Sequence, residues 1–232
     1  PPTVADFDGD GRPEVGTASA DYYVVLDRDC DADPLPEGCA SPGILWQVRN
    51  EDCSSRATGS SVFDFEGDGA AEVVYADETT FRIFSGATGE ILFEDGSHGS
   101  HTRIEMPVIA DVDNDGNAEI VIAENRSRDG RPGIEVWHDL ADNWVNTRRV
   151  WNQHSYHITN IDEDGSIPAP EETSWTRYNS FRQNVQGEGL FLAPDLLPVD
   201  LRALLLDCPE AITLTVFVEN QGFGTTYAAP IA

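Results

Sequence analysis

Short apolar stretches separated by turn-forming residues run along most of this sequence. They hold about five residues each and are rich in β-branched and aromatic side chains, as in Tyr22–Leu26, Phe81–Phe84 and Gly133–Trp137. Runs of this kind, bounded by glycine, aspartate or asparagine, are typical of β-strands. No stretch of useful length has the periodicity of an amphipathic helix. The pattern therefore predicts an all-β protein.

Neighbouring stretches are predicted to pair as hairpins. The turn 85–89 (Ser-Gly-Ala-Thr-Gly) separates two of them directly, whereas the first pair encloses a longer loop that contains residues 30–39. The predicted pairs are 22–26 with 44–48, 81–84 with 90–93, and 133–137 with 143–145.

An acidic loop precedes each hairpin and joins two further predicted strands. It recurs at intervals of about 50 residues, a period that suits the four-stranded blade of a β-propeller. The copies share acids at positions 1, 3, 5 and 9 and a glycine at position 6. The acids are Asp6, Asp8, Asp10 and Glu14 in the first copy, Asp64, Glu66, Asp68 and Glu72 in the second, and Asp111, Asp113, Asp115 and Glu119 in the third.

The alternation of acids predicts three calcium sites. Calcium takes six to eight oxygen ligands, and a tight loop with acids at alternate positions can turn them toward one centre. The glycine permits the sharp turn, and the backbone carbonyls at position 7, those of Arg12, Ala70 and Asn117, can add an oxygen. Carboxylates this close would repel each other without a cation. One copy alone would fit a solvated turn, but three copies in register favour the metal.

Two other readings of the loops fit less well. An EF-hand needs flanking helices and an acid at position 12, where this chain has Thr17, Tyr75 and Ile122. Magnesium prefers a stricter octahedron and keeps more of its waters.

A fourth, weaker copy contains Asn160, Asp162 and Asp164 as candidate ligands. Pro168 replaces its last acid, so its calcium site is expected to be weaker than the other three. Glu163, Glu171 or Glu172 could supply the missing carboxylate.

The three loops resemble the FG-GAP or VCBS repeats, the calcium-binding blades also found in the head of integrin alpha chains. The family pattern Asp-x-Asp-x-Asp-Gly-x-x-Asp/Glu fits residues 6–14 and 111–119 fully, whereas the second loop carries Glu66 at position 3, where ligation could be looser or through water. The resemblance implies an extracellular β-propeller with calcium-stabilised blades over residues 1–192. The expected blades are 1–58, 59–106, 107–158 and a degenerate 159–192.

Two later segments extend the resemblance. Arg149–His157 and Trp175–Asn184 resemble stretches near the end of the propeller in large secreted bacterial repeat proteins. A proline-rich hinge, 193–198, marks a boundary. Beyond it, 200–204 and 212–222 resemble the first strands of a bacterial cell-adhesion-related immunoglobulin-like domain, so 193–232 is predicted to be a hinge and a partial β-sandwich. The alternative is an extra edge hairpin packed on the propeller.

Charge and hydropathy narrow the class of partner. The chain has 42 acidic and 14 basic residues and a net charge of -28, which argues against nucleic-acid or anionic-membrane binding and for bound cations. No run of about 18 apolar residues occurs, so no membrane insertion is expected. The sequence begins at Pro1 without a signal-peptide pattern, so a processed, trimmed or partial chain is expected.

The cysteines favour an oxidising compartment. Cys30 and Cys39 bracket a turn-rich loop, and a local disulfide is predicted there; two reduced, buried thiols are the alternative. Cys53 and Cys208 could pair across the boundary, although sequence alone leaves the connectivity open.

Other candidate chemistry is less specific. His98 with His101, or His154 with His157, could bind a transition metal, but such histidines more often form hydrogen bonds in loops. Four tryptophans could line a sugar site, although core packing is favoured; they are Trp137, Trp144, Trp151 and Trp175. No nucleophile elbow, zinc-protease motif or P-loop occurs, and acid pairs of glycosidase type could arise by chance.

The favoured function is therefore a non-enzymatic, extracellular calcium-binding scaffold for adhesion or assembly. Its expected partner is a protein or glycan at the cell surface or matrix. Residues 212–218 could also complete the sheet of a neighbouring copy and form a filament. The alternative is the propeller platform of a secreted carbohydrate-binding or carbohydrate-active enzyme.

Overall fold

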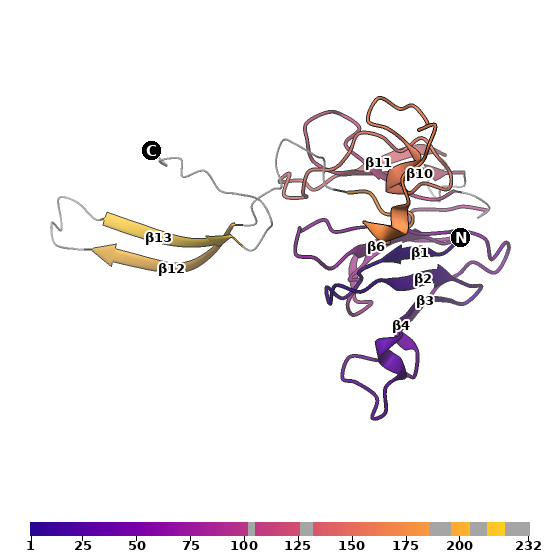
Figure 1. Cartoon of the computed structure of the whole chain (residues 1–232), viewed down its shortest axis with the longest axis horizontal. Helices are drawn as coiled ribbons and strands as arrows, with labels where there is room; N and C mark the ends of the chain where they lie inside the picture. Colours follow the sequence, from indigo (N-terminus) through magenta and orange to yellow (C-terminus); the bar gives the residue numbers. More distant parts are fainter. Residues whose placement is uncertain (102–104, 126–131, 186–195, 205–212, 221–232) are drawn as a thin grey trace.

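The computed structural model describes residues 1–101, 105–125, 132–185, 196–204 and 213–220. These residues form three small antiparallel sheets and a two-stranded hairpin, so the all-β prediction is confirmed (Figure 1). The first sheet contains β1 (Thr3–Ala5), β2 (Glu14–Ala18), β3 (Tyr22–Leu26) and β4 (Ile44–Arg49). The second contains β5 (Ser61–Phe63), β6 (Glu72–Ala76), β7 (Phe81–Phe84) and β8 (Ile91–Asp95). The third contains β9 (Val108–Ala110), β10 (Glu119–Glu124) and β11 (Gly133–Trp137).

Each sheet is a meander in which consecutive strands pair. The acidic loop joins the first strand to the second in all three sheets, as predicted. The first strands lie next to one another, with β1 beside β5 and β5 beside β9. The three acidic loops therefore leave their sheets at equivalent places.

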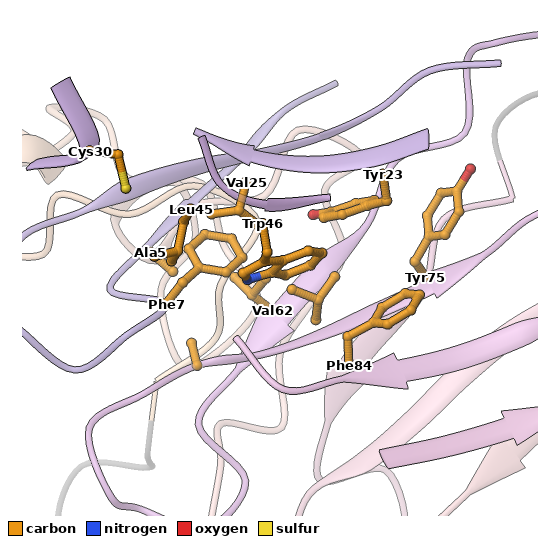
Figure 2. Packing of buried hydrophobic residues seen from close by; sticks show 12 residues of the cluster. Ala5, Phe7, Tyr23, Val25, Cys30, Leu45, Trp46, Val62, Tyr75 and Phe84 are labelled. Atoms are coloured by element: carbon orange, nitrogen blue, oxygen red, sulfur yellow. The ribbon is translucent and has the colours of Figure 1, made fainter. Parts of the chain in front are cut away.

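The sheets pack face to face, with the second sheet in the middle. Strand β6 is buried at every position because successive side chains point to opposite neighbours. Val73 and Tyr75 belong to the cluster shared with the first sheet, and Val74 and Ala76 to the cluster shared with the third. In Figure 2 the ring of Tyr23 lies between those of Trp46 and Tyr75, with centroid distances of 5.6 and 5.3 Å. Burial of these two interfaces supplies the hydrophobic stabilisation of the fold.

The third unit differs from the prediction at its last strand. Residues 143–145 do not pair with β11, and the third sheet has three strands. Instead, the N–H of Val145 donates to the carbonyl of Phe65 in the second unit at 2.9 Å, and the ring of Trp144 lies 4.4 Å from that of Phe65. This segment therefore contacts the neighbouring second sheet instead of pairing with β11.

The expected fourth blade is also absent from the part of 159–192 that the structure describes. Residues 159–185 contain no strand; the 3-10 turns η2 (Ile158–Asn160) and η3 (Ser174–Thr176) and irregular chain take its place. Pro168 and Pro170 lie in this segment and cannot donate to a sheet ladder. The described residues accordingly form no closed ring of blades.

Residues 181–185 tie the sheets together from this irregular region. Phe181 exchanges two backbone hydrogen bonds with Val4 of β1, at 2.8 and 3.0 Å, and the carbonyl of Arg182 accepts from Val62 of β5 at 3.0 Å. The side-chain amide of Asn184 donates to the carbonyl of Ile109 in β9 at 2.8 Å. One short segment therefore contacts the first strand of every sheet.

The side chain of Arg182 is buried where these strands meet, with 1% of its surface exposed. It donates to the carbonyls of Ser60 at 2.8 Å, Pro107 at 3.0 Å and His154 at 2.5 Å, and to the hydroxyl of Ser61 at 2.8 Å. Burial lowers the pKa of this guanidinium to about 10, so it remains protonated at neutral pH. A single cation thus joins three segments that are distant in sequence.

Strands β12 (Leu196–Leu204) and β13 (Thr213–Asn220) form an antiparallel hairpin with a register shift between Pro198 and Asp200. The two strands predicted here are confirmed, and the hairpin lies apart from the three sheets in Figure 1. No immunoglobulin-like sandwich occurs among the described residues. Cys208, and with it the proposed Cys53–Cys208 pairing, lies outside them. No described helix could span a membrane.

The predicted disulfide between Cys30 and Cys39 is confirmed, with a Cα–Cα distance of 5.6 Å. Cys30 is fully buried in the cluster between the first two sheets, and the short turn η1 (Asp29–Asp31) carries it there. The bond therefore anchors the long β3–β4 connection to the core.

Replacing both cysteines, as in Cys30→Ala with Cys39→Ala, should reduce the free energy of unfolding by about 2–3 kcal/mol, because the closed loop no longer restricts the unfolded chain. Urea unfolding with and without dithiothreitol measures the effect. The reductant should destabilise the wild type and leave the double variant unchanged. Free thiols at both positions in non-reducing mass spectrometry would contradict the bond.

Candidate metal centre

The first carboxylate of each acidic loop organises the loop backbone. Asp6 Oδ1 accepts from the N–H of Gly9 at 2.8 Å, and its Oδ2 accepts from Gly11 at 2.8 Å. Asp64 repeats both bonds in the second loop, and Asp111 accepts one backbone N–H in the third. Side-chain bonds of this type favour tight turns. Each loop is therefore wrapped around its first acid.

Two positions in every loop adopt left-handed backbone. Their φ angles are 78° and 86° at Gly9 and Gly11, 74° and 99° at Gly67 and Gly69, and 68° and 104° at Asn114 and Gly116. Glycine reaches this region without strain, and asparagine more readily than most residues. The glycine at position 6 was predicted, but the same requirement at position 4 was missed. The recurrence of glycine or asparagine there was its signal.

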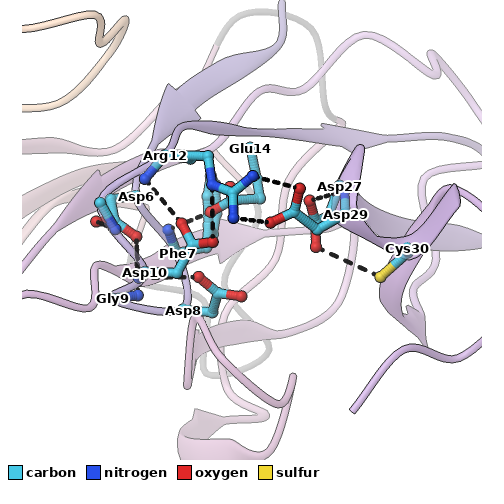
Figure 3. A network of polar contacts seen from close by, with 11 residues as sticks. Asp6, Phe7, Asp8, Gly9, Asp10, Arg12, Glu14, Asp27, Asp29 and Cys30 are labelled. Atoms are coloured by element: carbon cyan, nitrogen blue, oxygen red, sulfur yellow. Dashed lines mark hydrogen bonds and ion pairs between the residues drawn. The ribbon is translucent and has the colours of Figure 1, made fainter. Parts of the chain in front are cut away.

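The carboxylates at positions 1, 3 and 5 converge in two of the loops. One ligand oxygen from each acid lies within 4.8 Å of the others, both in the first loop, shown in Figure 3, and in the third. The two groups are Asp6, Asp8 and Asp10, and Asp111, Asp113 and Asp115. This is the convergence predicted from the alternating acids.

The second loop forms no such group among the described residues. Its backbone is wrapped like the others, but Glu66 stands at position 3, and its charge is, after burial, the largest cause of the raised pKa of Glu72. The longer side chain thus interacts electrostatically with the acid of position 9. The glutamate at position 3, which departs from the family pattern, thus coincides with the loss of the converging group.

The glutamate at position 9 has a role that sequence analysis did not predict. One carboxylate oxygen accepts the backbone N–H of position 2 in every loop, at 2.8 Å for Glu14, 3.0 Å for Glu72 and 2.8 Å for Glu119. This bond fastens the start of the second strand to the start of the loop. The glutamate therefore closes the loop whether or not its other oxygen binds a cation.

The residues at position 7 are also fixed in the same way in all three loops. Their backbone N–H groups donate to the carboxylate of position 5, at 2.7 Å for Arg12, 2.9 Å for Ala70 and 2.8 Å for Asn117. In the first loop the Arg12 side chain also bridges Asp10 and Asp29, with N–O distances of 3.3 and 2.8 Å (Figure 3). The residues at position 7, whose carbonyl oxygens are expected to bind calcium, are thus held by the same hydrogen bond in every loop.

Burial and mutual repulsion disfavour charge on several of these acids. The pKa of Glu14 is raised to about 8, mainly by burial and in addition by the neighbouring Asp8, Asp6 and Asp27 carboxylates. Burial is also the largest cause of the raised pKa of Glu119. A cation placed among these groups would reverse the effect, because opposite charge favours the ionised form. The arrangement has the electrostatics of a cation site.

The fourth loop does not repeat this geometry. The Asn160 side chain bonds to the carbonyl of Ser155 at 2.9 Å and to the N–H of His157 at 3.3 Å, whereas Asp162 and Asp164 bond to Ser166. The acids suggested as replacements have other partners, Glu163 with Arg148, Glu171 with His157 and Glu172 with Arg177. The loop is an ordinary turn in this structure.

The remaining candidates separate into core and surface residues. No histidine belongs to a potential metal-binding group of the described residues, and the group of Asp27, Cys30 and Cys39 holds two disulfide sulfurs. Trp137, Trp144 and Trp151 pack against the cluster between the second and third sheets, as favoured. Trp175 is 73% exposed.

Comparison with known proteins agrees with this geometry. Residues 64–122, which contain the second and third loops, match the profile of the FG-GAP-like repeat. The crystal structure of the V. cholerae biofilm matrix protein Bap1 is similar, with a TM-score of 0.62 and 28% sequence identity. The match covers 77% of this chain and 28% of that chain. No curated protein sequence matches. The chain thus contains an FG-GAP-like repeat region and resembles part of a biofilm matrix protein.

Stabilisation by calcium should increase with pH. In the metal-free chain the raised pKa of Glu14 means that its contribution to stability is complete below the unfolded value of 4.5 and is lost as the pH rises to about 8. Calcium competes with that proton, so its effect should grow over the same interval. The shift in melting temperature on adding calcium should be larger at pH 8 than at pH 5.5. Glu14→Gln should flatten this dependence, and an equal shift at both pH values in the wild type would contradict it.

Proposed function

We propose that the chain is a calcium-stabilised, non-catalytic module of an extracellular structural or adhesive protein. The observation that carries the proposal is the convergence of three carboxylates in two loops built on the same hydrogen-bond plan. FG-GAP repeats commonly bind calcium, and this chain contains a region of that type. The disulfide and the resemblance to a biofilm matrix protein support an extracellular location.

In this proposal the three sheets are blades of the propeller type. The acids at positions 1, 3 and 5, the carbonyl at position 7 and the second oxygen of position 9 would hold the ion in the first and third loops. The ion would brace the junction between the first two strands of a blade. The second loop would bind more loosely because its carboxylates, all in the described part of the chain, form no converging group like those of the first and third loops.

Calorimetric titration with calcium, with magnesium as the comparison, tests metal binding directly. Asp111→Asn should remove one site and leave the first loop unchanged. Labelled protein should also be retained on extracted bacterial matrix in millimolar calcium and be released by EDTA. Absence of calcium-dependent heat in the wild type would reject the proposed cofactor, and retention unaffected by EDTA would reject its role in adhesion.

The partner in this role would be a protein or glycan of the surface or matrix. Assembly of copies through residues 212–218 is a second route. Within the chain β13 already pairs with β12, so a neighbour would have to add to the other edge of β13 or displace β12. Light scattering in millimolar calcium tests this: the full chain should form assemblies that are lost on deleting 195–232. A monodisperse full-length chain would reject it.

A further inference from the structure

An aromatic groove of about 260 Å³ opens between the second and third sheets, beside the second acidic loop. Strand β8 contributes Phe93, the end of β11 contributes Trp137, and the segment that follows contributes Trp144. The acids Glu66 and Glu72 also line it. The groove thus brings aromatic rings and carboxylates together at the surface.

The aromatic wall is held rigidly from behind. The ring centroids of Phe93 and Trp137 are 5.0 Å apart, and Trp137 lies 5.6 Å from the fully buried Phe81. Trp144 lies 4.4 Å from Phe65, which is also buried. Contacts of this kind fix the plane of each ring. The wall is therefore preorganised, which reduces the entropy lost when a ligand binds.

Large apolar side chains at the rim of the groove are exposed to solvent. Leu92 is 52% exposed, Leu140 is 93% exposed and Phe93 is 37% exposed. Apolar side chains that gather around a concave site, with a few polar groups beside them, mark ligand-binding surfaces. These side chains are free to contact a ligand without disturbing the core.

The polar groups of the groove limit the kind of ligand. The carboxyl groups of Glu66 and Glu72 offer oxygens that accept hydrogen bonds, and His138, with 59% of its side chain exposed, lies on the same lining. An anionic ligand would be repelled by a chain of net charge -28. A purely apolar peptide side chain would cover the carboxylates without pairing them, which costs free energy.

A neutral pyranose can contact both the aromatic rings and the carboxyl groups of the groove. Its C–H face can stack on an indole ring while its hydroxyl groups donate to carboxylates at the edge. We infer that this groove binds a neutral pyranose unit of a glycan, with Trp144 and Trp137 as the stacking surface. This deepens the proposed adhesive function, since it names the partner class, and Glu66 and Glu72 are shared with the second acidic loop.

Quenching of tryptophan fluorescence, confirmed by calorimetry, tests the inference. The probes are cellohexaose, mannohexaose and chitohexaose as neutral glycans, oligogalacturonate as an anionic glycan, and an uncharged hexapeptide of leucine and phenylalanine. All titrations use saturating calcium. At least one neutral glycan should bind, and Trp144→Phe should weaken it about tenfold because the larger ring and its N–H are lost.

Two further variants keep the result interpretable. Trp175→Phe makes the same change at an exposed tryptophan outside the groove and should leave affinity unchanged. Leu140→Ser changes an almost fully exposed rim residue, so it should fold normally and weaken binding about threefold.

The inference is overturned if no neutral glycan binds, if only the anionic glycan or the peptide binds, or if Trp144→Phe and Leu140→Ser bind as the wild type does. Melting temperatures with and without EDTA, measured without glycan, report on calcium separately. A calcium-stabilised protein that binds no glycan would therefore reject this inference and leave the proposed calcium role intact.

Discussion

Removal of calcium should lower the free energy of unfolding of this chain by about 3.6 kcal/mol if the first and third loops, whose carboxylates converge, are loaded. Extracellular calcium modules have dissociation constants of about 10⁻⁴ M or weaker. At a constant of about 0.1 mM and about 2 mM free calcium, each site contributes roughly 1.8 kcal/mol. Two such sites amount to a large part of the whole stability of a domain. The chain should therefore melt far lower in EDTA and become sensitive to proteases.

Thermal unfolding in calcium, in magnesium and in EDTA measures this effect. Asp111→Ala is the informative variant because its carboxylate both joins the converging group and wraps the third loop. Asp162→Ala is its matched control in the incomplete fourth loop, where the side chain accepts a hydrogen bond from the Ser166 hydroxyl, and it should cost less. Identical melting curves in calcium and EDTA would exclude a structural metal.

Local sequence patterns were sufficient for most of the strands. Tyr22–Leu26 and Phe81–Phe84 are apolar, short and bounded by turn residues, and each appears as a strand with the predicted bounds. Such segments were predictable because composition and turn residues act over a few positions. Residues 143–145 have a similar composition, yet they bond to Phe65 of the preceding unit. That partner lies too far away in sequence for any local pattern to reveal it.

The acidic loops were predictable for a similar reason, up to a point. Asp6, Asp8 and Asp10 converge because alternation within a tight turn is itself a local property. The hydrogen bond from Phe7 to Glu14 was missed, because the sequence shows an acid at position 9 but not the direction of its oxygens. Residue type therefore identified the site, and the fold decided which atoms face it.

Residues 149–157 and 175–184 were identified from the sequence only by their resemblance to other proteins. Stretches 149–157 and 175–184 were noted without a physical role, because neither has a strand or helix period. The role of the second stretch rests on two polar side chains, Arg182 and Asn184, which bond to the carbonyls of Pro107 and Ile109 at β9, and Arg182 also bonds to the carbonyl of His154 in the first stretch. A buried arginine without a carboxylate partner has no local sequence signature. Such contacts become visible only when the sheets are assembled.

Replacing Arg182 should therefore cost more than any other single substitution outside the acidic loops. Arg182→Met preserves most of the volume but removes the donor to the carbonyls of Ser60 and His154, whereas the Pro107 carbonyl keeps the Ser61 hydroxyl as a donor. Losing the partners of several buried polar groups costs about 1–3 kcal/mol for each group that stays unpaired. The methionine variant no longer has to bury the charge of the guanidinium, and the saved desolvation free energy offsets part of this loss. We expect a net loss of about 3–5 kcal/mol in urea unfolding, measured in saturating calcium.

Two further variants serve as comparisons, Arg182→Lys at the same position and Arg177→Met on the surface. Lysine keeps the charge but lacks the planar fork that reaches Ser60, Pro107 and His154 together, so it should recover only part of the loss. Arg177 lies on the surface, with 54% of its side chain exposed, and the same change to methionine there should alter stability by about 0.5 kcal/mol or less. If Arg182→Met were as stable as the wild type, the sheets would be held together by their apolar interfaces alone, and the buried cation would have no part in joining them.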